Sequence, residues 1–288
     1  MNDDLPPADY LAKEVSPPLF RELITNRGAV MLRNAVERTL LVKYGQSLEE
    51  LLARYSGVPL EEFEQHLQSP DPKERDLWEQ IKLSHIFDRT FKPLAGYSYF
   101  DIVRSSGLWE LGARAFPESP VTESAVSNSR RVTDNDVRRL WDTPIEFHVD
   151  SQFFYHHILS INFWTPLVPC GVDAPSLKVI DLSVARTKAY LEYNPKGYEN
   201  PEPKDFAFMS RFRCSKMAVP MLEKHGLLKR MWAPEFKLGD VLAFTNFTMH
   251  ATHFTKGMTR PRTSIEVRVD FPGLASRIMR PTRTLSAG

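Results

Sequence analysis

The second half of the chain is dominated by short runs of residues that favour β-strands. Six such runs follow residue 120, most of them next to turn-forming residues: 121–132, 145–150, 158–165, 177–181, 240–245 and 263–270. The run 158–165 is rich in β-branched and aromatic side chains and ends at Pro166, which is typical of a strand. Many short strands after a helical block predict an α+β fold, in which a sheet sandwich or barrel is backed by helices.

The first third of the chain has mainly helical patterns. Residues 36–55 place apolar side chains near helical spacing. Within them, Ser47-Leu-Glu-Glu50 resembles a capping box, which predicts a break and a fresh helix start near Ser47. Pro59 followed by acidic residues predicts another helix, and helical patterns return at 73–90 and 100–116.

The remaining segments fit one domain. Residues 3–18 are Pro-rich and acidic, which predicts an irregular arm, and the apolar run 28–34 predicts a strand. No shift in composition is sharp enough to divide the chain. We therefore expect a single domain with these parts: the whole chain 1–288, helical support at about 36–116, a barrel core at about 120–271 and a helical insert at about 184–228.

Composition excludes some classes of partner. A formal net charge of +1 gives no field that would attract nucleic acid. No apolar run reaches transmembrane length, and the N-terminus lacks the basic and apolar regions of a secretory signal. Cys170 and Cys214 are the two cysteines, which predicts free structural thiols in a reducing, cytoplasmic setting. The sequence leaves the oligomeric state open.

His148 and Asp150 lie two residues apart in the predicted strand 145–150. Side chains alternate across a strand, so both would project from one face. An imidazole and a carboxylate in this arrangement can bind adjacent positions on a divalent metal. A second histidine would complete the facial triad of non-haem Fe(II) oxygenases. His-x-Asp alone occurs by chance in many proteins, so its meaning depends on the rest of the chain.

His250 is the candidate third ligand. It follows the turn signal Gly239-Asp240 and an apolar run that ends at Phe244. A strand, a short connection and a return strand would bring His250 over the sheet face that carries His148.

Three other histidines compete for these positions: His156, His157 and His253. His156 and His157 are rivals for the first half of the motif. His253 is the rival of His250, and on a strand these two face opposite sides, so at most one can join the site.

Arg262 enters the predicted strand 263–270 twelve residues after His250. A guanidinium can hold a carboxylate with two parallel hydrogen bonds, which suits the distal carboxylate of a dicarboxylic co-substrate. Arg260, Arg262 and Arg268 could equally be ordinary surface charges.

These motifs together resemble the phytanoyl-CoA dioxygenase family of Fe(II)- and 2-oxoglutarate-dependent oxygenases. The resemblance is best over residues 120–271 and rests on five motifs: Phe147-His-x-Asp150, Phe163-Trp-x-Pro-Leu167, Gly239-Asp-Val-Leu-x-Phe244, His250 and Arg262. It implies a double-stranded β-helix, which is a cupin-like jelly-roll barrel, flanked by helices mainly from the N-terminal third.

The resemblance also implies roles for individual residues. His148, Asp150 and His250 would bind Fe(II), with 2-oxoglutarate and O2 as co-substrates. Arg262 would pair with the side carboxylate of 2-oxoglutarate. Two further residues, Thr252 and Trp164, fall where the family lines the co-substrate pocket, although Trp164 could equally be a core aromatic. The implied reaction is hydroxylation or another oxidation of a small molecule, with release of succinate and CO2.

The substrate is predicted to be compact and largely apolar, with secondary metabolism as a candidate setting. Gln152, Phe154 and His157 follow the metal motif and could line the substrate, although aromatic residues here could also pack in the core. The chain departs from the family after Leu167, where the usual Gly-Gly and Gly-Ser-His segments are missing. Because of this departure, the substrate of a relative that has these segments cannot be assigned to this chain.

Two other classes of function compete with this interpretation. One is a barrel that binds a ligand without turnover, but such a protein has no need of two histidines, an aspartate and an arginine in this pattern. The other is a metal-dependent isomerase or hydrolase on the same barrel. Zinc prefers tetrahedral sites with His-rich or Cys-containing ligand sets, so a mononuclear iron site fits the pattern better.

Overall fold

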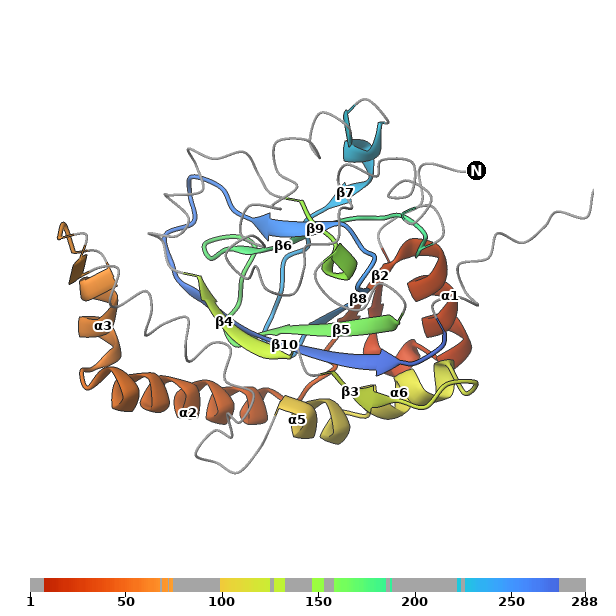
Figure 1. Ribbon diagram of the computed structural model, residues 1–288, viewed down its shortest axis with the longest axis horizontal. Coiled ribbons are helices and arrows are strands. Elements are labelled where there is room, and N and C mark those ends of the chain that lie inside the picture. Colours follow the sequence, from red (N-terminus) through yellow and green to blue (C-terminus); the bar gives the residue numbers. More distant parts are fainter. Residues whose placement is uncertain are drawn as a thin grey trace, which may run out of the picture.

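The computed structural model combines helices with two β-sheets, which confirms the predicted α+β class (Figure 1). It describes residues 8–67, 69–71, 73–74, 99–124, 127–132, 147–152, 158–184, 187, 222–223 and 226–274. No helix among these residues is long and apolar enough to cross a membrane.

The larger sheet has seven strands in the described part of the chain. Its order is β1 (Asp9–Leu11), β2 (Ala29–Arg33), β8 (Val241–Thr245), β5 (Leu159–Pro166), β10 (Arg262–Phe271) and β3 (Thr122–Glu123), with β4 (Asn128–Val132) also paired to β10. Only the β1–β2 pair is parallel among these. The smaller sheet has the order β7 (Met231–Trp232), β6 (Ser176–Ile180) and β9 (His250–His253).

Helices cover one face of the larger sheet and the smaller sheet covers the other (Figure 1). The helices are α1 (Pro17–Arg27), α2 (Arg38–Ser56), α3 (Leu60–Leu67), α5 (Tyr99–Ser105) and α6 (Leu108–Ala115). Short 3-10 helices are η1 (Ala12–Glu14), η2 (Asp150–Gln152) and η4 (Leu227–Arg230).

Strand alternation divides the larger sheet into two chemically different faces. On β8, Val241 and Ala243 pack in the core beneath the helices, whereas Leu242 and Phe244 pack toward the smaller sheet. On β10, the odd-numbered residues from Ile265 to Phe271 join the helical core. The even-numbered residues of β10 therefore face the smaller sheet, and they are polar or charged. This polar inner face, enclosed between the two sheets, is where the candidate site lies.

The N-terminal segment corrects the expected irregular arm at 3–18. Residues Asp9–Leu11 form β1 beside β2, and Arg33 donates to both carboxylate oxygens of Asp9 at 2.7 and 2.6 Å. Helix α1 begins at Pro17, because Ser16 caps it by accepting from the backbone of Leu19 at 3.4 Å. The described part of this segment, from Ala8 on, is therefore part of the fold.

Helix α2 corrects the expected break near Ser47. The helix is continuous from Arg38 to Ser56, and the Ser47 hydroxyl donates to the carbonyl of Lys43 at 3.0 Å, within the helix. Leu41, Tyr44 and Leu48 lie three and four residues apart on its buried face. Packing of that face against the sheet outweighs the local capping pattern, as tertiary contacts commonly do.

The expected strand 145–150 is also wrong in its described part. His148 forms a single isolated bridge with His250, and Asp150 already begins the 3-10 helix η2. The next backbone N–H, on Ser151, donates to the carbonyl of Asn246 at 2.7 Å instead of to a strand partner. Most of the helical insert predicted at 184–228 and of the helix at 73–90 lies outside the described residues.

Candidate metal centre

The backbone pairs His148 with His250. Each residue donates its N–H to the carbonyl of the other, at 3.0 and 2.9 Å, and directly opposed residues of this kind carry their side chains on one face. The two imidazole rings lie with their centroids 4.2 Å apart. The bridge therefore brings together two histidines from distant parts of the sequence.

A tight connection between β8 and β9 sets the position of His250. The hydroxyl of Thr248 donates to the carbonyl of Gly28 at 2.6 Å and accepts from the backbone N–H of Thr245 at 3.1 Å. This turn is buried, so β9 starts at a fixed point above the larger sheet. Strand β9 is the return strand that the sequence predicts.

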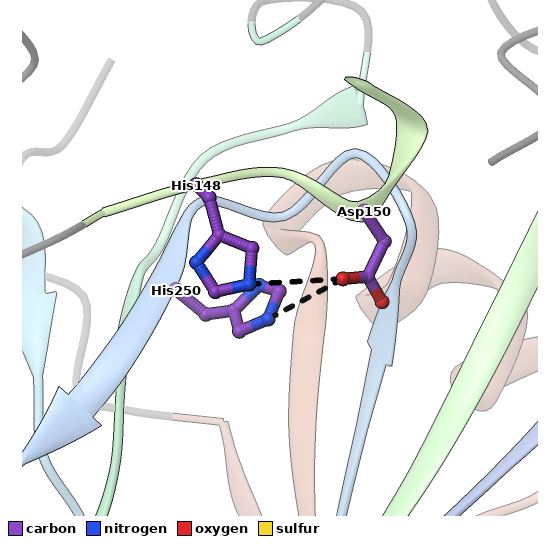
Figure 2. A group of neighbouring side chains, drawn as sticks. All are labelled: His148, Asp150 and His250. Atoms are coloured by element: carbon purple, nitrogen blue, oxygen red, sulfur yellow. Dashed lines mark ion pairs between the residues drawn. The ribbon is translucent and has the colours of Figure 1, made fainter. Parts of the chain in front are cut away.

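Asp150 completes a cluster with the two histidines (Figure 2). Its Oδ1 atom lies 3.8 Å from Nε2 of His148 and 3.6 Å from Nε2 of His250. One ligand atom from each residue lies within 4.8 Å of the others. Figure 2 shows all three groups pointing toward one another, so the structure brings the predicted ligand set together.

The hydrogen bonds around the cluster leave metal-binding atoms available. Nδ1 of His250 lies 2.9 Å from the carbonyl oxygen of Thr248. A carbonyl only accepts, so Nδ1 donates this bond. In the neutral imidazole the lone pair is then on Nε2, which is the usual arrangement of a metal-binding histidine. On the other side, Arg268 binds Oδ2 of Asp150 through Nε at 3.0 Å and Nη2 at 2.9 Å. Oδ1 is thereby left facing the imidazoles.

The donor set fits an iron ion. Two imidazoles and one carboxylate with further positions open are the ligands of mononuclear non-haem iron sites. Ligand atoms about 2.1 Å from one ion, at a right angle, lie about 3 Å apart, so small side-chain movements would close the distances seen here. Burial raises the pKa of Asp150, but the charges of Arg268, His250 and His148 outweigh that effect and lower it to about 2. The carboxylate is therefore ionised, as a ligand must be.

Arg268 is the site residue that sequence reasoning missed. It is buried, and beside its bonds to Asp150 it donates from Nη2 to Glu266 at 2.9 Å. The pattern Ile265-Glu-Val-Arg-Val269 carried a signal, since charges alternating with apolar residues lie on one face of a strand. Because both faces of this strand are buried, that charged face had to be an internal one.

Arg262 and Trp164 lie together on the polar inner face. The guanidinium of Arg262 lies 5.1 Å from the centroid of the Trp164 ring and donates to the carbonyl of Ser176 at 3.4 Å. Both side chains are buried, and Trp164 Nε1 has no hydrogen-bond partner among the described residues. Thr252 shares the face of β9 that carries His250. By contrast, Arg260 is exposed and pairs with Asp173 at 3.0 Å.

The rival ligands divide into two groups. His253 is on β9, three residues after His250, so its side chain lies on the opposite face of the strand and it is not part of the cluster. His156, His157 and Phe154 lie outside the described residues, as does the side chain of Gln152.

The Gly239-Asp240 motif is structural. Gly239 has a φ of 102°, and a Cβ there would approach the carbonyl oxygen of Val36 to 2.8 Å, so only glycine fits. The buried carboxylate of Asp240 accepts from Arg33 at 2.6 Å and from the backbone of Asn34 at 3.1 Å. The motif therefore fixes the start of β8 and supplies no ligand.

Comparisons with known proteins bear on the fold. No protein-family model and no curated protein matches the sequence. The crystal structure of SnoK, a non-haem alpha-ketoglutarate-dependent carbocyclase from nogalamycin biosynthesis, aligns with 93% of this chain and 90% of its own, at 12% sequence identity and a TM-score of 0.50. The chain shares the fold of that enzyme. The predicted resemblance to Fe(II)- and 2-oxoglutarate-dependent oxygenases is confirmed at the level of the fold.

Two other solved structures align with lower scores. AviO1 from Streptomyces viridochromogenes Tue57 covers 88% of this chain and 93% of its own, at 12% identity and a TM-score of 0.48. EvdO2 from Micromonospora carbonacea var. aurantiaca, complexed with 2-oxoglutarate, covers 87% and 89%, at 11% identity and a TM-score of 0.45. Sequence identities this low are evidence for a similar fold alone, so the reaction has to be argued from the site.

Proposed function

We propose that this chain is a non-haem Fe(II)- and 2-oxoglutarate-dependent oxygenase of the phytanoyl-CoA dioxygenase-like type. The observation that carries the proposal is the cluster of His148, Asp150 and His250, whose two imidazole nitrogens and one carboxylate oxygen face one another. The fold shared with SnoK supports it. Iron bound there, with 2-oxoglutarate and O2, supplies the oxidising power to hydroxylate a C–H bond, with release of succinate and CO2.

The residues around the cluster would divide the work of holding the reactants. Arg268 keeps Asp150 oriented and ionised. Arg262 would pair with the distal carboxylate of 2-oxoglutarate, since a guanidinium removed from water binds a carboxylate strongly. Trp164 and Thr252 would add an indole N–H and a hydroxyl as donors. Enclosure between the two sheets would keep water away from the reacting groups.

The proposal extends to the architecture and the substrate. We infer that the two sheets belong to a double-stranded β-helix within a single domain spanning 1–288. The substrate is a small, compact and largely apolar molecule of secondary metabolism, in a site to which Gln152, Phe154 and His157 contribute.

The experiment measures succinate formed from 2-oxoglutarate by the Fe(II)-loaded protein, before and after O2 is admitted. It is run without substrate and against panels of terpenoid, polyketide-like, amino-acid and acyl-CoA compounds. We expect O2-dependent succinate in the wild type, stimulated by one compound class, and none in His250→Ala. Absence of both 2-oxoglutarate binding and succinate in the wild type would overturn the proposal. Efficient hydroxylation of an acyl-CoA would overturn its substrate class.

A further inference from the structure

Asn162 lies near the middle of β5, on the face that points toward the smaller sheet. In the strand register it stands opposite Phe244 of β8 on one side and Arg268 of β10 on the other, and directly opposed side chains share a face. The ring of Phe244 lies 4.7 Å from that of His250, and Arg268 binds Asp150. Asn162 is therefore flanked by two residues that each touch a member of the metal centre.

The amide of Asn162 is buried and unpaired. Its exposed fraction is 1%, and neither Oδ1 nor Nδ2 has a hydrogen-bond partner among the described residues. Buried amides in folded proteins are nearly always paired. An unpaired amide loses its hydrogen bonds to water on folding and gains none within the protein, which destabilises the folded state. Asn246 shows the ordinary case in the same molecule: its Oδ1 accepts from Ser160 at 3.0 Å and its Nδ2 donates to Ile158 at 2.9 Å.

We propose that Asn162 binds the 2-oxo acid end of the co-substrate, donating from its amide N–H to an oxygen of the ligand group held at the metal centre. The inference rests on the proposed function and adds a binding residue to it. The oxygens of a keto group and a carboxylate only accept, so an amide donor suits them. An amide also adds no charge beside Asp150, which an additional lysine or aspartate at this position would do.

The neighbours of Asn162 on β5 agree with a ligand lying along the strand. Trp164 is two residues further on the same face, about 7 Å along the strand, and its unpaired Nε1 is accompanied by Arg262. Among the described residues, β5 therefore has two unpaired donors near an arginine, Asn162 at the metal centre and Trp164 beyond it. A five-carbon dicarboxylate has two acceptor ends at a comparable separation.

The test measures ligand binding and needs no turnover. The Mn(II)-loaded protein is titrated calorimetrically, without O2, with 2-oxoglutarate and with pyruvate, which has the 2-oxo acid end alone. We expect Asn162→Leu to lower the affinity for both ligands by the same factor, about tenfold to a hundredfold. Asn162→Asp, which is nearly isosteric, should weaken both at least as much through charge repulsion. Arg262→Leu should weaken 2-oxoglutarate alone.

A control on the ligand-free protein separates binding from structure. Because the amide of Asn162 has no partner without ligand, the thermal unfolding midpoint of metal-free Asn162→Leu should equal or exceed that of the wild type. Asn246→Leu, which breaks two satisfied hydrogen bonds, should lower it. A lowered midpoint in both Asn162 variants, with unchanged ligand affinity, would assign Asn162 a structural role and overturn the inference.

Two other results would also overturn it. Unchanged 2-oxoglutarate affinity in folded Asn162→Leu or Asn162→Asp would place the residue against the substrate instead. Loss of 2-oxoglutarate affinity with unchanged pyruvate affinity would place it at the other end of the co-substrate. If the Mn(II)-loaded wild type bound no 2-oxoglutarate, the proposed function would fail before the variants were compared.

Discussion

His148 and His250 exchange both backbone hydrogen bonds, at 3.0 and 2.9 Å, although about a hundred residues of sequence separate them. The pairing depends on peptide groups and not on the imidazoles. The two rings are therefore held on one face of the fold by the backbone alone, so the site is organised before any metal arrives. Truncating either side chain removes a ligand and leaves the bridge that positions the other.

We therefore expect His148→Ala, Asp150→Ala and His250→Ala each to abolish iron binding, and the two histidine variants to keep the wild-type fold. Asp150→Ala should also lower stability, because Arg268 loses a buried partner. Calorimetric titration with Fe(II) or Mn(II) and circular dichroism measure the two effects. His253→Ala is the matched control and should bind metal normally. Loss of metal binding in that control, with normal binding in His250→Ala, would reverse the assignment.

Arg262→Leu should raise the 2-oxoglutarate requirement steeply. Losing one partner of a desolvated, hydrogen-bonded charge pair costs about 2–5 kcal/mol, or roughly thirty-fold to several thousand-fold in affinity. Arg260→Leu is the control, because Arg260 is exposed and pairs with Asp173 at the surface, where an ion pair contributes at most about 1 kcal/mol. The dissociation constant of 2-oxoglutarate on the Mn(II)-loaded variants checks both. Equal effects in the two variants would rule out a special role for Arg262.

Arg268→Leu should lower both the stability and the metal affinity of the protein. The substitution leaves the buried carboxylate of Asp150 and the partly buried carboxylate of Glu266 without their shared cation, and breaking a buried ion pair in this way costs about 3–5 kcal/mol. Arg268→Lys should recover part of the stability, because it keeps the positive charge. The recovery should be incomplete, because lysine cannot donate to Oδ2 from two nitrogen atoms. Denaturant unfolding and Mn(II) titration provide the measurements. Wild-type metal affinity in a folded Arg268→Leu protein would contradict the positioning role.

Lys178 should make the stability of the protein depend on pH. Burial lowers the pKa of its ammonium group to about 8. Between that value and the ordinary value near 10.5, the unfolded chain binds more protons than the folded one, so stability should rise with pH across this window. Below it the full cost of burying the charge is present. Lys178→Met should raise the free energy of unfolding at pH 7 by up to about 3 kcal/mol. It should also flatten the rise of that free energy between pH 8 and 10.

Chemical unfolding of the metal-free protein at pH 7, 8, 9 and 10 measures this effect. Lys229→Met replaces an exposed lysine and should leave the profile unchanged. A Lys178→Met protein whose stability rises with pH as steeply as that of the wild type between pH 8 and 10 would show that another group titrates there.

The clustering of His148, Asp150 and His250 could be predicted from the sequence, because the spacing of the residues indicates which side chains share a face. His148 and Asp150 are two residues apart, and His250 and His253 are three apart, so extended backbone alone selects which side chains share a face. The three side chains lie together even though Asp150 begins a 3-10 helix instead of belonging to a strand. Most of the strands were predictable from their composition, since runs such as 158–165 are rich in β-branched and aromatic residues.

Long-range contacts are what the sequence could not supply. Arg268 binds Asp150, more than a hundred residues earlier, and the local alternation at 265–269 places Arg268 on one face of a strand without identifying that partner. Asn162 looks like one polar residue in an apolar strand until the register places Phe244 and Arg268 beside it. The helix break expected at Ser47 failed in the same way, because tertiary burial outweighed a local capping pattern.

The side chains of strand β10 alternate strictly between two surroundings: the odd-numbered residues from Ile265 to Phe271 lie in the helical core, and the even-numbered residues, Arg268 among them, lie on the face toward the site. Inserting or deleting one residue within it would exchange these sets, driving two arginines and a glutamate into the apolar core. In evolutionary terms, β10 can accept substitutions but not a change of length. We expect variation in length to be confined to its flanks, such as the exposed turn at 255–257, where an insertion would leave the register of β10 unchanged.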